Sequence, residues 1–304
     1  MSFIKRLSNV DENDATPPEI LYKYVAPERV DILQHYRIRM SPPGSFNDPF
    51  EGYPHEVPYG SDEEILEKLR RNEQLPGIIH AIHEALYIKG CESREWTLED
   101  VNSNFITAYK TAHDVISQGL AEVHANKHPS DRFSVQWIFD RLLGILSLTE
   151  VNDDILMWGI YSRSHAGFVI GFNIHHEFFM RTGFGVRKVH YSDERPTIVV
   201  GDDWNMRFHL TKSLHWKYEK EWRLLAPLPV KSSEDAPRDA LGLPIILFDI
   251  PPSAINRIIF GVRMSRDDRD RLIDIAGNNR ELRHVKFFQA QVDERLYCIN
   301  VRQL

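Results

Sequence analysis

The distribution of β-prone segments along the 304-residue chain constrains its fold more than any other feature. Two β-prone runs, at 20–25 and 36–40, precede a long block at 61–143 whose apolar residues follow helical spacing. Further β-prone runs follow from residue 145 to the C-terminus. Because these strands stand in groups on either side of the helical block and do not alternate with helices, the pattern predicts an α+β fold.

The same pattern predicts the domain organisation. Residues 1–19 are expected to form a polar N-terminal leader, since acidic residues and prolines dominate their second half. Residues 20–304 are expected to form a single α+β domain, within which the block 61–143 is a helical insertion or lid. A polar loop is expected at 231–243. The run 186–191 is expected to be a strand, residues 202–214 have helical spacing, and residues 152–154 are expected to cap a short helix.

Composition and charge exclude several classes of function. The net charge of −7 argues against a general nucleic-acid coat, although a local basic cleft stays open. Cys91 and Cys298 are too few for a disulfide framework or a metal quartet, so a cytoplasmic location is expected. No apolar run approaches the ~20 residues of a membrane span, so no membrane contact is expected. His80 and His83 have helical spacing but no completing ligands, so no metal site is expected.

The segment 217–225 carries the clearest candidate chemistry. Its mixture of aromatic, aliphatic and charged residues before a proline-rich stop predicts a strand that places Glu219, Glu221 and Arg223 on one face. Two carboxylates roughly 6.5 to 7 Å apart along a strand suit the stabilisation of a cation that develops on a sugar, or the holding of a nucleophile beside it. The alternative is a solvated strand face on which Arg223 relieves the repulsion between the two carboxylates.

Other polar residues share faces of predicted strands. Arg37 and Arg39 lie on one face of the run 36–40, where two guanidinium groups can fork onto phosphate oxygens, or can simply lie exposed beside the sheet. Ser147 and Thr149 point the same way from the run 145–150. The segment 41–51, dense in Pro, Gly, Asn and Asp, is expected to be a structured loop, with a ligand-binding role left open.

Several of these segments together resemble the bacterial domain-of-unknown-function 2971 family. The resemblance extends from about residue 20 to the C-terminus, apart from the helical block and the loop 231–243. It implies a fold more than a reaction, since the biochemistry of that family is not settled. The motifs are 21–24 (LYKY), 46–51 (FNDPFE), 146–150 (LSLTE), 157–158 (MW) with Tyr161, 167–172 (GFVIGF), 218–223 (YEKEWR) and 258–261 (IIFG).

The order of parts is also similar to that of mono-ADP-ribosyltransferases, which implies a split β-sheet core and NAD as substrate. In that resemblance Glu221 matches the catalytic glutamate, and Glu219 matches the acidic residue that favours a basic or hydroxyl acceptor. Ser147 and Thr149 match the strand that lines the nicotinamide pocket. Tyr161 would stack on nicotinamide, and it follows Trp158 in the aromatic helix after that strand.

The first strand departs from the transferase pattern. Transferases of this type carry Arg or His there, whereas this chain has Lys23 flanked by Tyr22 and Tyr24. Lysine contacts a phosphate as a point charge and cannot fork onto two oxygens as arginine does. Arg37 or Arg39 is therefore the alternative contact for the pyrophosphate.

Three functional hypotheses follow. The first is an NAD-dependent mono-ADP-ribosyltransferase or NAD glycohydrolase, a toxin or phage-defence effector whose acceptor is protein, nucleic acid or water. The second is a non-catalytic binding or sensing protein on the same fold, which uses the helical block as its partner surface. The third is a metal-dependent nuclease or other hydrolase, for which Asp48, Glu51, Glu219 and Glu221 would have to converge.

Overall fold

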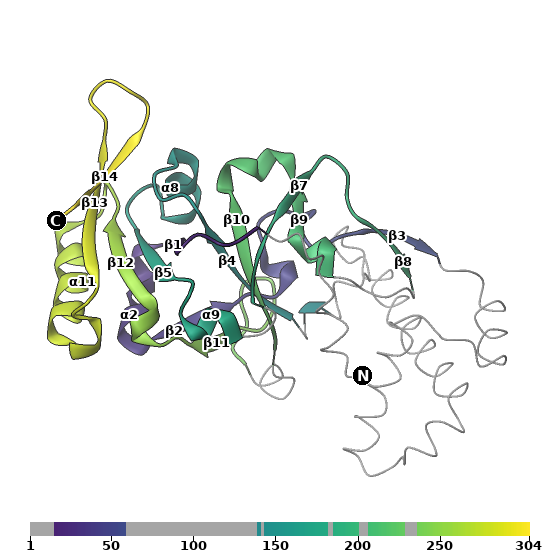
Figure 1. Cartoon of the computed structure of the whole chain (residues 1–304), viewed down its shortest axis with the longest axis horizontal. Helices are drawn as coiled ribbons and strands as arrows, with labels where there is room; N and C mark the ends of the chain where they lie inside the picture. Colours follow the sequence, from purple (N-terminus) through teal and green to yellow (C-terminus); the bar gives the residue numbers. More distant parts are fainter. Residues whose placement is uncertain (1–14, 59–138, 141–142, 182–184, 201–205, 229–235) are drawn as a thin grey trace, which may run out of the picture. The chain divides into compact units, whose positions relative to one another are not determined.

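The computed structural model describes residues 15–58, 139–140, 143–181, 185–200, 206–228 and 236–304 (Figure 1). The chain divides into two compact units. The larger unit is made of Glu12–Glu51, Ile138–Asp193 and His209–Leu304, and it contains every element discussed below except one small sheet and the first three residues of η3 (Met206–Leu210). That sheet belongs to the smaller unit and pairs β3 (His55–Pro58) in parallel with β8 (Thr197–Val200).

The larger unit is built on an eight-stranded sheet with the order β14-β13-β12-β5-β1-β4-β10-β6. Neighbouring strands are antiparallel except β12 and β13, which run parallel and are connected through α11 (Arg266–Asn278). This largely antiparallel sheet with few helices confirms the predicted α+β class. Its strands are β1 (Ile20–Val25), β4 (Leu143–Thr149), β5 (Phe168–Asn173), β6 (Val186–Lys188), β10 (Glu221–Pro227), β12 (Ile255–Phe260), β13 (Lys286–Val292) and β14 (Ile299–Gln303).

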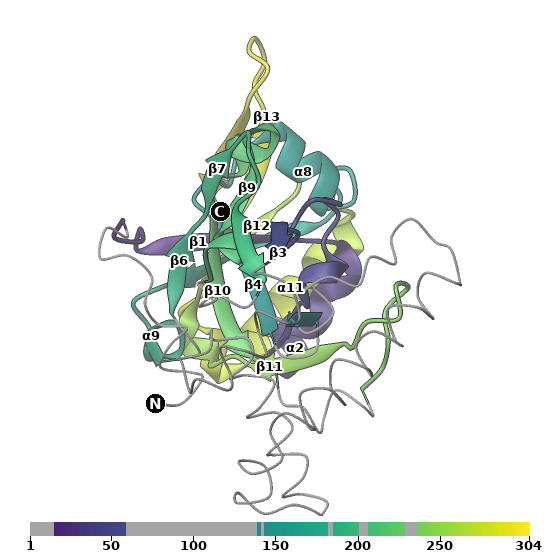
Figure 2. The same ribbon diagram turned by 90° about the vertical axis from the view of Figure 1, so that its right-hand side faces the viewer.

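Shorter elements surround this sheet. β2 (Arg37–Met40) pairs with β11 (Ile246–Asp249), and β7 (His190–Ser192) pairs in parallel with β9 (Thr211–Ser213). The helices α2 (Asp31–His35) and α11 lie side by side (Figures 1 and 2). The remaining helices are η1 (Pro27–Val30), η2 (Pro43–Ser45), α8 (Ile155–Tyr161), α9 (Glu177–Arg181), η3 (Met206–Leu210), η4 (Leu214–Glu219), η5 (Pro252–Ala254) and η6 (Arg280–Leu282).

Strand alternation divides the core between the two faces of the sheet. Leu21 of β1 and Leu224 of β10 pack with Leu272 of α11 in one apolar cluster. Tyr22 of β1 packs with Trp158 of α8 in a second cluster on the opposite face. The side chains of successive residues in a strand point to opposite faces, so a single strand serves both clusters. The second face is the one that holds the candidate site.

Three predicted elements are corrected by the structure. The predicted strand 217–225 is wrong over its first part, because η4 continues to Glu219 and Lys220 turns the chain with φ 43° before β10 begins at Glu221. The helical spacing at 202–214 is interrupted, since the chain after η3 becomes the short strand β9. The run 186–191 forms two strands, β6 and β7, that pair with different partners.

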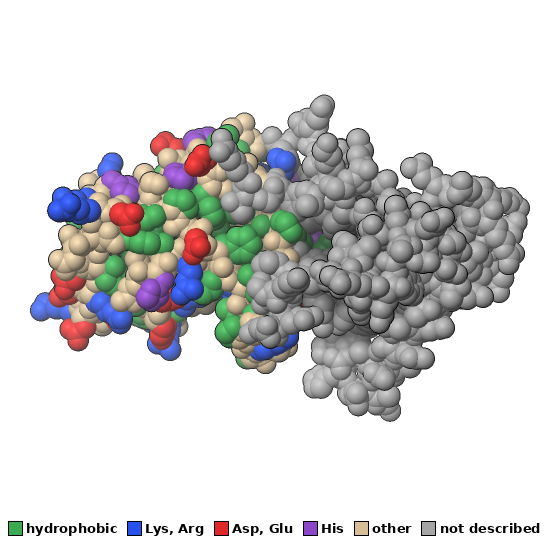
Figure 3. Space-filling model, turned by 90° about the horizontal axis from the view of Figure 1, so that it is seen from below, with side chains coloured by type: hydrophobic (Ala, Val, Ile, Leu, Met, Phe, Trp, Pro, Cys, Tyr) green, Lys and Arg blue, Asp and Glu red, His purple; other side chains and the backbone are tan. Residues whose placement is uncertain are grey.

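Two predicted segments fall mostly outside the described residues. Residues 1–14 of the predicted leader and residues 59–138 and 141–142, which hold most of the predicted helical block, are not described. Leu143, the last residue of that block, begins β4. In the described part of the chain, no helix combines the length and the apolar character that crossing a membrane requires. Acidic and basic side chains are interspersed on the described part of the face in Figure 3.

Candidate functional site

A pocket of about 390 Å³ opens on the α8 face of the sheet, within the larger unit. Its walls come from β1, β4, α8, β9, η4, β10 and the loop that follows β2. The pocket brings together most of the residues that the sequence predicted for a site. These are Tyr22, Lys23, Ser147, Thr149, Tyr161, Glu219 and Glu221.

The pocket lies where the sheet opens between β1 and β4. β1 pairs with β5 along its whole length, from Ile20 to Val25, but it pairs with β4 only through Tyr22 and Thr149. Beyond that pair, the Lys23 ammonium group crosses the gap and donates to the Ser147 carbonyl oxygen at 3.1 Å. A side chain therefore replaces the ladder bonds that a continuous sheet would have here.

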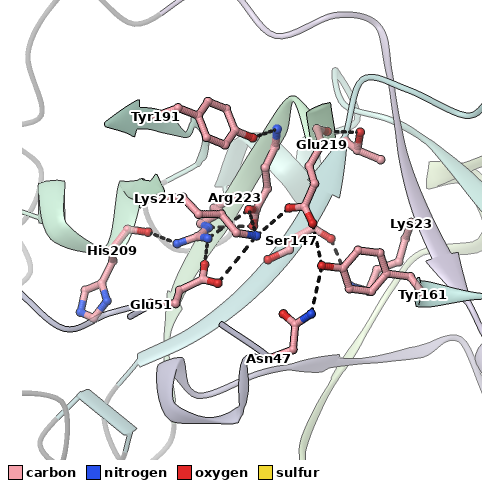
Figure 4. Close-up of polar contacts among 12 residues, drawn as sticks. Lys23, Asn47, Glu51, Ser147, Tyr161, Tyr191, His209, Lys212, Glu219 and Arg223 are labelled. Atoms are coloured by element: carbon pink, nitrogen blue, oxygen red, sulfur yellow. Dashed lines mark hydrogen bonds and ion pairs between the residues drawn. The ribbon is translucent and has the colours of Figure 1, made fainter. Parts of the chain in front are cut away.

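Two carboxylates of the pocket share one buried ammonium group (Figure 4). Lys212 Nζ donates to Glu219 Oε2 at 2.6 Å and to Glu221 Oε2 at 3.0 Å. A third carboxylate, that of Glu51, has its Oε2 atom 3.7 Å from Lys212 Nζ. Lys212 Nζ also lies 4.9 Å from the centre of the Trp216 ring. All three glutamates and the lysine are buried, so this group of charges interacts under weak solvent screening.

Arg223 is a second buried cation of this group, and it lies two residues after Glu221 on the same face of β10. Its Nε donates to Glu221 Oε1 at 2.8 Å and its Nη2 donates to Glu221 Oε2 at 3.1 Å, a bidentate pair. Nη1 donates to the His209 carbonyl oxygen at 2.5 Å, and Nη2 forms an ion pair with Glu51. With no exposed surface, Arg223 is a structural counter-ion for two carboxylates.

The electrostatics of these groups follow from burial and pairing. Burial, reinforced by the neighbouring Glu219 charge, raises the pKa of Glu221 although Lys212 opposes the shift. Burial by itself lowers the pKa of Lys212, but the carboxylates of Glu221 and Glu219 outweigh it and raise that pKa. Burial and the Glu219 charge raise the pKa of Tyr161. Glu221 is thus a carboxylate held in a dry environment beside two cations.

Tyr161 and Thr149 hold the other carboxylate in place. The Tyr161 hydroxyl donates to Glu219 Oε1 at 2.6 Å, and the Asn47 side-chain amide donates to the Tyr161 hydroxyl at 3.4 Å. Thr149 Oγ1 donates to the Glu219 carbonyl oxygen at 2.5 Å and accepts from the Val151 amide at 3.0 Å. Thr149 therefore fastens the end of η4 to β4, and Tyr161 presents its ring to the pocket.

Three predicted site residues do not line the pocket. Arg39 donates to Asp239 at 2.6 Å and to the Pro244 carbonyl oxygen at 3.2 Å. Arg37 is exposed on β2, opposite Asp249 of β11. The side chain of Trp158, a residue of α8, is buried, and its Nε1 donates to the Asn152 carbonyl oxygen at 2.9 Å. The pocket thus receives its cations from Lys23 and Lys212.

Lys212 is the functional residue that sequence reasoning missed. It lies in a three-residue strand within a segment whose spacing looks helical, so no local pattern marks it. Glu51 was considered as a carboxylate that could converge with Glu219 and Glu221, and the structure does bring the three together. Cations occupy the space between them, and no group of three His, Cys, Asp or Glu side chains among the described residues is arranged to hold a metal ion.

Residues 157–224 match the model of a family described as a protein of unknown function (DUF2971). The match confirms the family resemblance predicted from the sequence, over a shorter span than the resemblance covers. It includes Tyr161, Lys212, Glu219, Glu221 and Arg223, so the charged half of the site lies inside the family region. No curated protein and no solved structure matches the chain.

Proposed function

We propose that the pocket binds NAD and that the protein cleaves its glycosidic bond, passing ADP-ribose to an acceptor or to water. The observation that carries this proposal is the position of Glu219 and Glu221 in the wall of a pocket that also contains aromatic rings and an amine. The opening of the sheet between β1 and β4 supports it, because a split sheet is the core that the transferase resemblance implies. The pocket volume lies within the range of small-molecule sites.

The proposed step breaks the bond between the nicotinamide nitrogen and the ribose C1′ carbon. The electron pair of that bond leaves with nicotinamide, and positive charge develops on the ribose ring. Glu221 is the group that stabilises this charge, since a fixed carboxylate in a dry pocket interacts strongly with a developing cation. An acceptor oxygen or nitrogen, or water, then forms the new bond at C1′, and the proton of the acceptor leaves to a base.

The remaining residues of the pocket have supporting roles in this proposal. Tyr161 and Phe46 offer aromatic faces for the nicotinamide ring, while Lys23 offers a donor for a phosphate oxygen. Lys212 orients both carboxylates before the substrate binds, and Arg223 orients Glu221. Preorganised charge of this kind is the main source of catalytic stabilisation in enzymes.

A second candidate is a non-catalytic binding protein that uses the same pocket. The observation that favours it is the saturation of Glu221, whose two oxygens already accept hydrogen bonds from Arg223 and Lys212. A carboxylate so neutralised stabilises a new cation less than a free one does. In this role the pocket would bind a ligand without breaking a bond in it.

The deciding experiment measures nicotinamide release from NAD by the purified protein, with and without cell lysate as a source of acceptors. Wild type is compared with Glu221→Gln, which keeps the shape and removes the charge. The matched control is Glu150→Gln, because Glu150 lies beside the same strands but does not line the pocket. We expect a loss of roughly a hundredfold or more for Glu221→Gln and near wild-type release for Glu150→Gln.

Binding measurements separate the two candidates. If wild type binds NAD, measured by calorimetry, but releases no nicotinamide under any condition, the non-catalytic role is correct. If it neither binds NAD nor turns it over, both forms of the NAD proposal fail. Circular dichroism of each variant shows whether a loss reflects the site or the fold.

A further inference from the structure

The pocket contains two lysines in opposite surroundings. Lys212 has three carboxylates within 4.0 Å of its ammonium group. Lys23, on the opposite wall, makes one hydrogen bond, to the Ser147 carbonyl oxygen, and no ion pair with any residue that the structure describes. Figure 4 shows Lys212 among Glu51 and Glu219, with Lys23 beside Ser147. Carboxylates therefore balance the charge of Lys212, whereas no ion pair balances that of Lys23 among the described residues.

The surroundings of Lys23 increase the fraction of its neutral amine form. Burial and, to a smaller extent, the cation of Arg29 lower its pKa, Glu221 and Glu219 raise it, and the net pKa is about 8. Those two carboxylates form their ion pairs with Lys212 and Arg223 and none with Lys23. A single backbone carbonyl satisfies one N–H donor and leaves the amine lone pair free to react.

We propose that Lys23 is a nucleophilic amine that condenses with small aldehydes, including the open-chain forms of reducing sugars, that enter the pocket. The amine nitrogen adds to the carbonyl carbon and a proton passes from nitrogen to oxygen, which gives a carbinolamine. Loss of water then gives an imine, so the atoms balance without any oxidant or reductant. Aromatic walls at Tyr22, Tyr24 and Phe46 favour planar aldehydes, and a desolvated lysine is the usual group for this chemistry.

Tyr161 and Glu219 supply a route for the protons of this condensation. Their hydrogen bond of 2.6 Å lies in the wall of the same pocket, and water loss from a carbinolamine needs a proton at the leaving oxygen. This inference does not depend on cleavage of NAD. It assigns a covalent modification site to Lys23, whereas bond cleavage in the proposed function depends on Glu221.

The test treats the purified protein with limiting pyridoxal at pH 7.5, reduces the imine with borohydride, and locates modified lysines by peptide mass spectrometry. We expect Lys23 to be modified at least about tenfold faster than the exposed lysines Lys217 and Lys220, and Lys212 to stay unmodified. The rate at Lys23 should reach half its maximum near pH 8, whereas the rates at the exposed lysines should still be rising there. Modification of Lys23 at the rate of the exposed lysines, or none at all, would falsify the proposal.

Two further arms remove alternative explanations. Pyridoxal 5′-phosphate is used beside pyridoxal, because selectivity for Lys23 with the phosphate compound alone would indicate an anion site and would overturn the proposal of a reactive amine. Lys188→Met is the matched control for Lys23→Met, since Lys188 is paired with Glu150 outside the pocket. Only Lys23→Met should remove the fast-reacting site, and NAD turnover plays no part in either readout.

Discussion

The two faces of β4 and β10 are both buried, yet they are built from different residue types. On one face the strands contribute an apolar layer to the core cluster that also includes residues of α2 and α11. On the other they contribute hydroxyl groups and charges to the pocket. The apolar positions are Leu146, Leu148, Trp222 and Leu224, and the polar positions are Ser147, Thr149, Glu221 and Arg223.

Burial alone therefore does not separate a core face from a site face. The apolar face is stabilised by the transfer of its side chains from water and by their packing against one another, and no residue in it needs a charged partner. The polar face is stable only as a set, because each buried charge needs its partner. This second face offers preorganised charge to a ligand, which an apolar layer cannot do.

The largest expected effect is that of Arg223→Met. The substitution removes one of the two cations that Glu221 and Glu51 share among the described residues and leaves Lys212 beside them, so we expect a loss of roughly 3–5 kcal/mol of folding free energy. Urea unfolding followed by circular dichroism measures the loss. In the double variant Glu221→Gln and Arg223→Met the loss should be smaller than in Arg223→Met alone. If the free-energy losses of the two single variants simply add in the double variant, the polar face does not act as a set.

Leu224→Ala tests the apolar face of the same strand. Leu224 is fully buried in the apolar cluster that also contains Trp222, and its truncation removes transfer free energy and leaves a cavity. We expect a loss of about 3 kcal/mol in urea unfolding. The loss should be equal at pH 6 and pH 8, because the side chain points to the face of β10 opposite Glu221 and Arg223. A marked pH dependence would mean that the two faces are coupled through β10.

The third prediction concerns pH and the Lys23 wall of the pocket. The pKa of Lys23 falls from 10.5 to about 8 on folding, so between these two pH values the unfolded chain binds a proton there that the folded chain does not. Stability from this group is therefore present above pH 10.5 and is lost as pH falls toward 8, with a slope of at most about 1.4 kcal/mol per pH unit.

Lys23→Met isolates that contribution. The variant should gain stability over wild type at pH 7 and should lose this advantage progressively between pH 8 and 10.5. Thermal unfolding across this pH range measures the difference, and Lys188→Met serves as the control because its lysine is paired outside the pocket. A constant difference between variant and wild type would mean that Lys23 titrates alike in the folded and unfolded chain.

Local patterns in the sequence predicted much of the fold and the β1, β4 and β10 walls of the site. The alternation in 20–25 and 145–150 predicted strands and the direction of Ser147 and Thr149, and Asp154 does cap α8 through the Met157 amide at 2.9 Å. These features depend on neighbours within a few residues. The ion-pair partners of charged side chains do not depend on such near neighbours. Arg39 is a candidate for a phosphate contact from the sequence, but it pairs with Asp239, which lies 200 positions away in the chain.

Local sequence patterns are therefore enough to predict which segments become strands, which side chains share a strand face, and which polar residues are candidates for a site. The folded structure is needed to place Lys212 between Glu219 and Glu221, to bury Arg223 as a counter-ion, and to separate β1 from β4 at a pocket. Periodicity records the direction of a side chain relative to its own strand. It carries no information about which distant charge will be buried beside it, because that choice depends on the pairing of whole elements.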